Sequence, residues 1–329
     1  MTIDTSPRSD VELLRVLADG DWHSGARVAE RLGISRSAVW KRLQVLEGRG
    51  LQVESQPGRG YRLVSALSLL DAARIHAAIP PPERGLVADV QVLARAGSTN
   101  SELLARLPAQ GVACIAEEQS GGRGRRGRMW HSPVAENLYL SWAHREDTGA
   151  GALVGLSLAA GVAMAEWLAR QGVPVQVKWP NDLLVGDAKL GGILVEMQGD
   201  AAGPCWVVIG VGLNVNMQRA PDLGQRWTSL RQELGAMQDR SRLAGELVGL
   251  LARLCEDFAR QGFAAWHERY QRRDALRGRP VLLVDGEQRH EGTACGVDAS
   301  GALEVETARG RRRYLSGEVS VRAADSGAG

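Results

Sequence analysis

The sequence has 329 residues, of which 44% are hydrophobic and 24% are charged, and its formal net charge is +2. This length exceeds that of one domain and this composition is typical of a folded chain, which excludes a single small module and a disordered protein. Because the net charge is small, any binding of nucleic acid must depend on a local basic surface.

The cysteines and the apolar segments indicate the compartment. The four cysteines, Cys114, Cys205, Cys255 and Cys295, lie far apart and show neither zinc-ligand spacing nor a disulfide framework. The first ten residues contain no basic segment followed by an apolar stretch, and the longest apolar run, 206–213, is too short to span a bilayer. We therefore expect a cytoplasmic protein without a membrane segment.

Residues 1–65 are expected to form a winged helix-turn-helix domain. Apolar residues recur at helical spacing in 11–17 and again in the stretch that follows Ser24, and a third helix is expected over 35–46. The segment 51–64 alternates on both sides of a glycine-containing turn, which predicts a hairpin with a basic tip. This hairpin would be the wing.

The third helix has the pattern of a recognition helix. Its apolar face contains Val39, Leu43 and Leu46, and cations and short polar side chains are expected on the other face. We expect DNA to contact residues 24–46 and the wing at 52–63, and the candidate residues are Ser35, Arg36, Ser37, Lys41, Arg42 and Arg59. The alternative is a three-helix interaction module whose basic face is only solvated, which the wing makes a weaker explanation.

The rest of the chain is expected to contain a linker and two further domains. A short helical stretch at 67–79 and the extended sequence Pro80-Pro81-Pro82 predict a linker over 66–85. Strands and helices alternate over 86–276, which predicts a mixed α/β catalytic domain. The strands are expected at 91–93, 112–116, 138–142, 175–179, 191–197 and 205–215, and the helices near 101–106, 153–171 and 241–261.

The final segment, 277–329, is expected to form a small β-barrel-like domain. Short strand-like runs such as 280–284 and 302–305 are separated by the turns Asp285-Gly286 and Ser300-Gly301. Together the segments predict an α/β (α+β) multidomain chain.

A loop rich in glycine and arginine, 121–130, predicts a phosphate-bearing ligand. Glycine allows close approach of the backbone, and arginine binds phosphate bidentately. Trp130 offers a flat face on which an adenine could stack. The segment alone is also compatible with an arginine-glycine loop that binds nucleic acid. The candidate ligands are Arg123, Gly124, Arg125, Arg126 and Arg128.

Two lysine motifs favour a nucleotide site of unusual type. The sequence contains neither GxxxxGK[ST] nor a complete GxGxxG fingerprint. The motif Lys-Trp-Pro-Asn-Asp at 178–182 ends a strand, and Lys189 precedes a glycine pair and a buried strand, so that two cations could neutralise a reacting phosphate. Each residue alone has a structural explanation, such as a solvated lysine, a turn or a core Trp179. The combination favours a site, and no motif for an enzyme nucleophile is present.

Five motifs occur in the order seen in biotin protein ligases, at 97–100, 122–128, 178–182, 189–193 and 210–216. The chain therefore resembles that family over nearly its whole length. The winged helix and the C-terminal β domain are similar to those of the bifunctional members, which also act as the biotin operon repressor. The resemblance implies a central biotin/lipoate ligase-like domain and a C-terminal SH3-like β-barrel.

The resemblance also implies a reaction and its partners. ATP with Mg²⁺ would convert biotin to biotinyl-5'-AMP, and biotin would then be transferred to a lysine of a biotin carboxyl carrier protein. The repressor would be a homodimer on operator DNA. Binding of Mg²⁺ is expected through the ATP phosphates, with Asp182 as a candidate ligand.

The resemblance implies roles for individual residues. The biotin-binding residues would be Ser98, Thr99, Asn100, Gln119, Arg123, Gly124, Arg125 and Lys189. The residues that contact ATP and the adenylate would be Arg126, Arg128, Trp130, Asn181 and Asn214, and the catalytic residues would be Lys189, Arg125, Lys178 and Asp182.

Two positions depart from the family pattern. Family members often carry Lys where this chain has Met129 and an aromatic residue where it has His131. Three alternative functions stay open: a lipoate-type ligase, a repressor that senses biotin without ligating it, and a ligase whose winged helix represses nothing.

Overall fold

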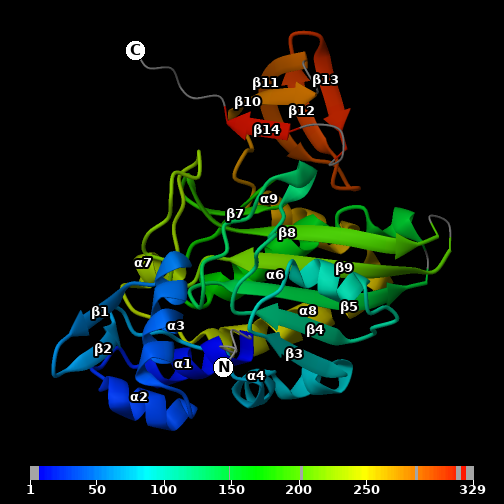
Figure 1. The fold of residues 1–329 in the computed structure, drawn as a ribbon. Helices are drawn as coiled ribbons and strands as arrows, with labels where there is room; N and C mark the ends of the chain where they lie inside the picture. Colours follow the sequence, from blue (N-terminus) through cyan, green and yellow to red (C-terminus); the bar gives the residue numbers. More distant parts are fainter. Residues whose placement is uncertain (1–6, 148, 201–202, 286–287, 316–319, 324–329) are drawn as a thin grey trace, which may run out of the picture.

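The computed structural model describes residues 7–147, 149–200, 203–285, 288–315 and 320–323 (Figure 1). Helices and a hairpin at the N-terminus, a central mixed α/β unit and a C-terminal sheet follow one another along the chain. Residues 1–6 and 324–329 of the expected terminal domains lie outside the described residues. The expected α/β multidomain class is confirmed.

The N-terminal unit is a winged helix-turn-helix, as expected. Ser24 accepts a hydrogen bond from the amide of Arg27, Ser35 caps the next helix in the same way, and Gly33 ends the helix between them in a left-handed conformation (φ 63°). The elements are α1 (Pro7–Leu17), α2 (Gly25–Leu32), α3 (Arg36–Gly48), β1 (Val53–Gln56) and β2 (Gly60–Leu63).

The expectation that Arg42 faces DNA is wrong. Val39, Arg42, Leu43 and Leu46 follow the spacing of one helical face, and all four are buried against the rest of the domain. Only 5% of Arg42 is exposed, and its charge acts on the carboxylate of Asp10. The position of Arg42 on the helix turns its side chain toward the buried face, although an arginine is chemically suited to bind DNA.

The central unit is a seven-stranded sheet of order β3-β4-β5-β9-β8-β7-β6 in which only β3 and β4, among the paired strands described, run parallel. The main core lies between the sheet and α6 and α8, whereas α5 packs on β4, β5 and β9. The strands are β3 (Asp89–Leu93), β4 (Val112–Ala116), β5 (Leu138–Glu146), β6 (Gln176–Lys178), β7 (Asp182–Val185), β8 (Ala188–Gly199) and β9 (Cys205–Leu213), and the helices are α5 (Thr99–Leu104), α6 (Leu156–Ala169), α7 (Leu230–Leu234), α8 (Arg240–Gln261) and α9 (Ala264–Gln271). The sequence analysis did not anticipate β7, α7 or α9, which are short.

The segment 66–85 is packed structure, contrary to the expected linker. It contains α4 (Ala72–Ala78) and the 3₁₀ helix η1 (Pro81–Leu86), and both contact α8. Ile75 and Ile79 are fully buried in the central core. The three prolines therefore begin a 3₁₀ turn, for which the φ angle of proline is suited, and not an extended segment.

The C-terminal unit is a five-stranded antiparallel sheet of order β13-β12-β11-β10-β14. Its core is continuous with that of the central unit, and the buried indole of Trp179 donates a hydrogen bond to the carbonyl of Gly301 (3.1 Å). Gly286 of the expected Asp285-Gly286 turn lies outside the described residues. The strands are β10 (Pro280–Asp285), β11 (Gln288–Val297), β12 (Leu303–Thr307), β13 (Gly310–Tyr314) and β14 (Ser320–Ala323). Among the described residues, we find no helix with the length and apolarity needed to cross a membrane.

A buried ion pair joins the segment 66–85 to the sheet. Arg240 at the start of α8 is 0% exposed, and its Nη1 lies 2.6 Å from Oε2 of Glu117. Arg240 also donates to the carbonyls of Asn137 and Ser68, and Glu117 accepts the amide of Leu70. Three segments distant in sequence therefore meet at one guanidinium.

Replacing Arg240 is expected to destabilise the central unit strongly. We expect Arg240→Gln to lower the free energy of unfolding by about 3–5 kcal/mol, because it leaves a buried carboxylate without its cation. The matched control is Arg242→Gln in the same helix turn, whose side chain is 44% exposed and pairs with Glu246, and it should cost less than about 1 kcal/mol. Urea unfolding followed by circular dichroism measures both, and equal losses would contradict the assignment.

Candidate active site

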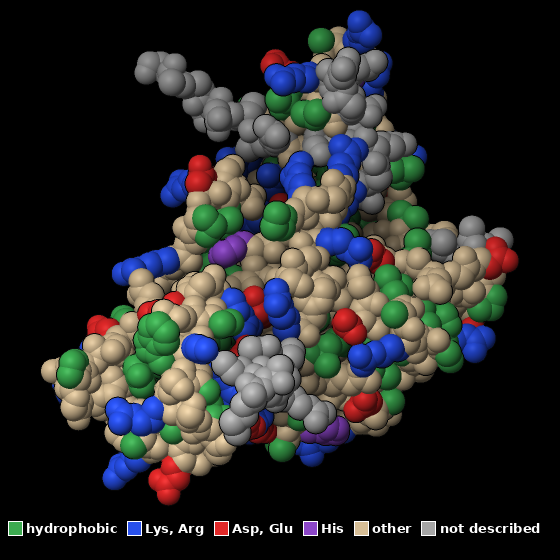
Figure 2. All heavy atoms as spheres, in the orientation of Figure 1, with side chains coloured by type: hydrophobic (Ala, Val, Ile, Leu, Met, Phe, Trp, Pro, Cys, Tyr) green, Lys and Arg blue, Asp and Glu red, His purple; other side chains and the backbone are tan. Residues whose placement is uncertain are grey.

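One large cavity collects the motifs that the sequence analysis singled out. Its volume is about 1030 Å³, enough for two small substrates, and it lies between the ends of the central strands, the glycine-arginine loop and the C-terminal unit. Figure 2 shows Lys and Arg side chains gathered where the C-terminal sheet meets the central unit. The expected site residues that line the cavity are Ser98, Thr99, Asn100, Gln119, Arg123, Gly124, Arg125, Arg126, Arg128, Trp130, Lys178, Asn181, Asp182 and Lys189.

One end of the cavity is lined by Thr99, Asn100 and Gln119, which belong to a chain of hydrogen-bonded polar side chains. Gln119 Oε1 accepts from the amide of Thr99 (2.9 Å) and from its hydroxyl (3.2 Å). Ser141 Oγ lies 2.7 Å from Thr99 Oγ1 and 2.6 Å from Asn100 Oδ1, and Asn100 Nδ2 donates to Glu196 Oε2 (2.7 Å). We call these five residues the polar cluster. Their mutual bonds fix donors and acceptors in place before any ligand arrives.

Ser141 and Glu196 belong to the polar cluster but to none of the sequence motifs. Ser141 is fully buried on β5, and its burial depends on the pairing of β5 with β4 and β9. Glu196 lies on β8 three residues beyond the motif 189–193, and its place on the same strand is the signal that could have identified it.

Glycines on β8 and β9 make room for two of the pocket side chains. A Cβ at Gly210 would lie 2.2 Å from Oδ1 of Asn100, and a Cβ at Gly212 would lie 2.5 Å from Cε2 of Trp130. Gly192 pairs with Gly212 across the strands and also lies under the indole. The glycines of these motifs are therefore required by close packing of side chains on the strand backbone.

The glycine-arginine loop has a defined turn at its tip. Arg123 and Met129 form a β-bridge, and the amide of Gly124 donates to the carbonyl of Arg128 (2.7 Å). Arg126 at the tip has a φ of 56°, an uncommon conformation for a residue with a side chain, which is found more often at functional sites. Arg123 reaches the polar cluster, where its Nη2 donates to Ser101 (2.9 Å) and Glu196 (3.2 Å).

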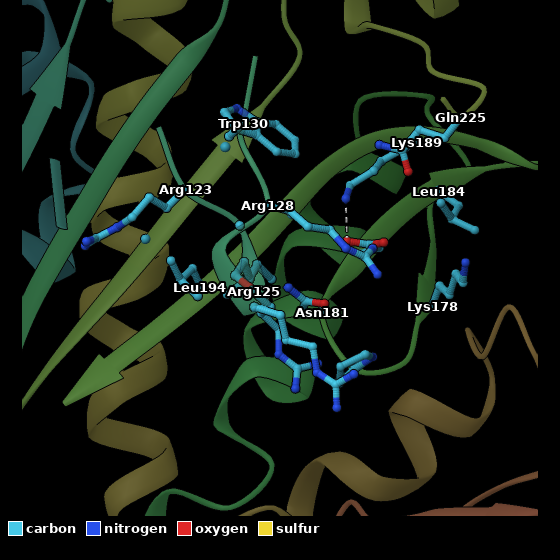
Figure 3. A pocket seen from close by; sticks show the side chains of 18 of the residues that line it. Arg123, Arg125, Arg128, Trp130, Lys178, Asn181, Leu184, Lys189, Leu194 and Gln225 are labelled. Atoms are coloured by element: carbon cyan, nitrogen blue, oxygen red, sulfur yellow. Dashed lines mark hydrogen bonds and ion pairs between the residues drawn. The ribbon is translucent and has the colours of Figure 1, made fainter. Parts of the chain in front are cut away.

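Cations dominate the other end of the cavity. Lys189 Nζ lies 2.7 Å from Asp182 Oδ1 and 5.3 Å from the centre of the Trp130 ring. In Figure 3, Arg123 lies at one side of the pocket, Lys178 and Lys189 at the other, and Arg128 between them. Burial lowers the pKa of Lys178, with Lys189, Arg128 and Arg279 acting in the same direction and Asp182 opposing them. This end is suited to a polyanion.

The pocket also concentrates the lysines of the chain. Of the 40 Lys and Arg residues only three are lysines, Lys41, Lys178 and Lys189, and the last two line the cavity. An ammonium group is a compact charge on a flexible stem, whereas a guanidinium is a planar fork. Lys178 and Lys189 therefore place two compact cations in the wall of the cavity.

The structure does not bring Asn214 to the cavity, where it was expected beside an adenine. Its side chain is buried and Nδ2 donates to the carbonyls of Lys189 (3.3 Å) and Thr228 (3.0 Å). Asn214 therefore joins β8 to the segment before α7. That segment and the C-terminal unit supply lining residues that the sequence analysis missed, among them Gln225, Arg226 and Arg279.

A second basic surface lies on the winged helix. Arg36, Ser37 and Lys41 are exposed on α3, and the Ser35 hydroxyl caps the helix. In the wing, Arg59 lies over the ring of Trp22, 4.8 Å from its centre. The stacking holds an exposed cation at the tip of the hairpin.

Comparison with known proteins agrees with this architecture. Residues 92–214 match the biotin/lipoate A/B protein ligase family, residues 11–62 match an HTH domain, and residues 277–322 match the biotin protein ligase C terminal domain. The chain is 42% identical to the bifunctional ligase/repressor BirA of Salmonella typhimurium, over 95% of this chain and 97% of that protein, and 41% identical to BirA of Escherichia coli, over 96% and 98%. The chain belongs to the biotin protein ligase family.

A solved member has the same catalytic fold. The ligase of Aquifex aeolicus, in complex with biotin and ATP, matches with a TM-score of 0.63 and 26% identity over 72% of this chain and all of that chain. The expected family and fold class are thereby confirmed. The present chain also has the N-terminal HTH domain, and its similarity to the bifunctional ligase/repressors covers 95% of its length.

The lowered pKa of Lys178 predicts unusual reactivity for this ligase. A larger fraction of the Lys178 amine is neutral at a given pH. Its acylation by acetic anhydride should therefore have a lower pH midpoint than that of the ε-amine in Nα-acetyl-lysine amide. Asp182→Asn removes the charge that raises the pKa and should lower the midpoint further. Mass spectrometry of the labelled protein over a pH series provides the measurement. A midpoint at or above that of the model compound would contradict the prediction.

Proposed function

We propose that this biotin protein ligase uses ATP to form biotinyl-5'-AMP, transfers biotin to a lysine of a biotin carboxyl carrier protein, and represses biotin synthesis genes through its winged helix. The observation that carries the proposal is the meeting, in one cavity, of the uncharged side chains of Thr99, Asn100 and Gln119 with a group of cations. A carboxylic acid with a neutral polar ring matches the first end, and a nucleoside triphosphate matches the second.

The end of the cavity beside the polar cluster is the proposed site for the biotin ring. Ser98, Thr99, Asn100 and Gln119 supply amide and hydroxyl groups that can donate to and accept from the ureido group. The hydroxyl of Ser98 makes no capping bond to α5, so it is available to the ligand. Arg123, Gly124 and Arg125 would cover this end as the loop closes over biotin and its adenylate.

The reaction is proposed to occur between the polar cluster and the cations. A carboxylate oxygen of biotin bonds to the α-phosphorus of ATP while the bond to the β-phosphate oxygen breaks, and the electron pair leaves with pyrophosphate. The lysine amine of the carrier then attacks the acyl carbon and AMP departs. Catalysis requires positioning and neutralisation of charge, which are supplied by Lys189, Lys178, Arg125, Arg126 and Arg128.

The adenine and the metal have separate candidate residues. Trp130 presents its ring to the cavity beside Lys189, where an adenine could stack, and Asn181 and Asp182 lie near the phosphate end. In the part of the chain that the structure describes, no group of three or more His, Cys, Asp and Glu side chains could hold a metal. Mg²⁺ fits as an ion carried by the ATP phosphates with Asp182 as one ligand, where it would neutralise the departing pyrophosphate.

Removing Lys189 should abolish ligation while leaving the protein folded. We expect Lys189→Ala to reduce ATP-dependent transfer of labelled biotin to a purified carrier domain at least 100-fold, since preorganised charge at a reacting phosphate typically contributes about that much. Lys41→Ala is the matched control, because Lys41 lies outside the cavity, and it should label the carrier at the wild-type rate.

The same assay tests the competing functions. Wild-type protein that binds biotin but labels nothing would indicate a sensor without ligase activity. Preferential transfer of lipoate would indicate a lipoate-type ligase.

The winged helix is proposed to bind operator DNA as part of a homodimer. Arg36 and Ser37 on α3 would enter the major groove, and Lys41 and Arg59 would contact the phosphate backbone. The hydroxyl of Ser35 caps the helix. Two half-sites on DNA would match the two-fold symmetry of a dimer. Arg42 has no place in this surface because it is buried.

The DNA-binding proposal predicts a change in salt dependence. Lys41→Ala should weaken binding to a promoter fragment of the biotin synthesis genes and reduce the slope of log K against log salt by about 1, as expected for one lost phosphate contact. Arg272→Ala on α9, an exposed arginine far along the chain from the winged helix, is the control and should leave the slope unchanged. An unchanged slope for Lys41→Ala, measured by fluorescence anisotropy, would argue against this contact.

A further inference from the structure

The junction between the central and C-terminal units forms part of the cavity wall. Ala275, Leu276 and Arg279 line it, together with Val321 on β14. The backbone of Arg279 is held on both sides, because its amide donates to the carbonyl of Leu276 (2.9 Å) and its carbonyl accepts from the amide of Ala294 (3.0 Å). The position of this arginine is therefore determined by the C-terminal sheet, and its side chain extends from there toward the central unit.

The guanidinium of Arg279 pairs with an exposed carboxylate across the cavity. Its Nη1 lies 3.0 Å from Oδ1 of Asp187, in the turn between β7 and β8, and the two side chains are 44% and 59% exposed. Ion pairs of this exposure contribute little to stability because water screens them. Arg279 can therefore leave Asp187 for a stronger anion at small cost.

The charge of Arg279 also acts on the cationic end of the cavity, where the phosphates are proposed to bind. It acts on Lys178, and Asp187 lies one residue beyond Gly186 in the strand turn that leads to Lys189. An arginine differs from these lysines because it can hold two phosphate oxygens at once. A triphosphate that extends from the lysines toward the C-terminal unit would meet this fork.

We infer that Arg279 binds the β- and γ-phosphates of ATP and the pyrophosphate that leaves, with Asp187 holding the side chain in place until the nucleotide binds. This inference rests on the proposed ligase function. As the bond between the α-phosphorus and the bridging oxygen breaks, charge develops on the pyrophosphate, and the guanidinium stabilises it without giving up a proton. Through Arg279 the C-terminal unit thereby contributes to the first step of the reaction, whereas the second step involves no pyrophosphate for this guanidinium to bind.

Binding of two nucleotides tests the inference directly. Arg279→Ala should weaken binding of the magnesium complex of α,β-methylene-ATP at least 10-fold and change the binding of AMP less than twofold, since AMP lacks the outer phosphates. Asp187→Asn frees the arginine and should leave the affinity for the ATP analogue unchanged or higher. Arg277→Ala is the matched control, because that neighbouring arginine is exposed and contacts Gln271, and it should behave as wild type.

Separate assays of the two reaction steps complete the test. Formation of the adenylate should slow at least 10-fold in Arg279→Ala, whereas transfer from preformed biotinyl-5'-AMP to the carrier should stay within twofold of wild type. Equal loss of analogue binding in Arg279→Ala and Asp187→Asn would overturn the inference in favour of a structural ion pair. The inference would also be overturned if Arg279→Ala weakened the binding of AMP as much as that of the ATP analogue. A defect of this variant in the transfer step, with a raised KM for the carrier, would overturn it as well.

Failure of the ligase proposal would look different. In that case the wild-type protein itself would form no adenylate, whereas the comparison of nucleotide affinities among the variants would remain measurable.

Discussion

Three consecutive side chains after β4 connect the parts of this molecule. Glu117 is buried against Arg240 and holds the segment 66–85 on the sheet. Glu118 pairs with Arg49 of the winged helix, which also binds Asp10. Gln119 accepts a hydrogen bond from the amide of Thr99 and so belongs to the polar cluster. Because the residues are adjacent, a displacement of this short segment would disturb the core, the contact with the winged helix and the end of the cavity beside the polar cluster together.

The cavity depends on what the neighbouring strands lack. Gly192, Gly210 and Gly212 leave the faces of β8 and β9 open, and the side chains of Asn100 and Trp130 fill that space. Any side chain at Gly210 or Gly212 would collide with its occupant at under 3 Å. The strand backbone thus forms a flat floor on which ligand-binding groups from other segments can be positioned.

Charge in the cavity is arranged by segments that differ in rigidity. The lysines stand at the ends of paired strands, the arginines lie on a loop with a strained tip at Arg126, and Arg279 comes from a separate sheet. Strand ends give fixed positions, whereas a loop can close over a reactive adenylate and exclude water. The division suits a reaction in which the intermediate must be retained and then released to a carrier.

The sequence by itself determined the family, the order of the domains and most of the cavity lining, because each motif is local and its residues stay together in any fold that keeps the segment intact. Tertiary structure decided the rest. Arg42 is buried and Asn214 clamps a backbone because side-chain direction depends on packing that composition does not reveal. Arg279 reaches the cavity only through the docking of two sheets that are far apart in the chain. Non-local contacts of this kind are set by the fold as a whole, and no short pattern encodes them.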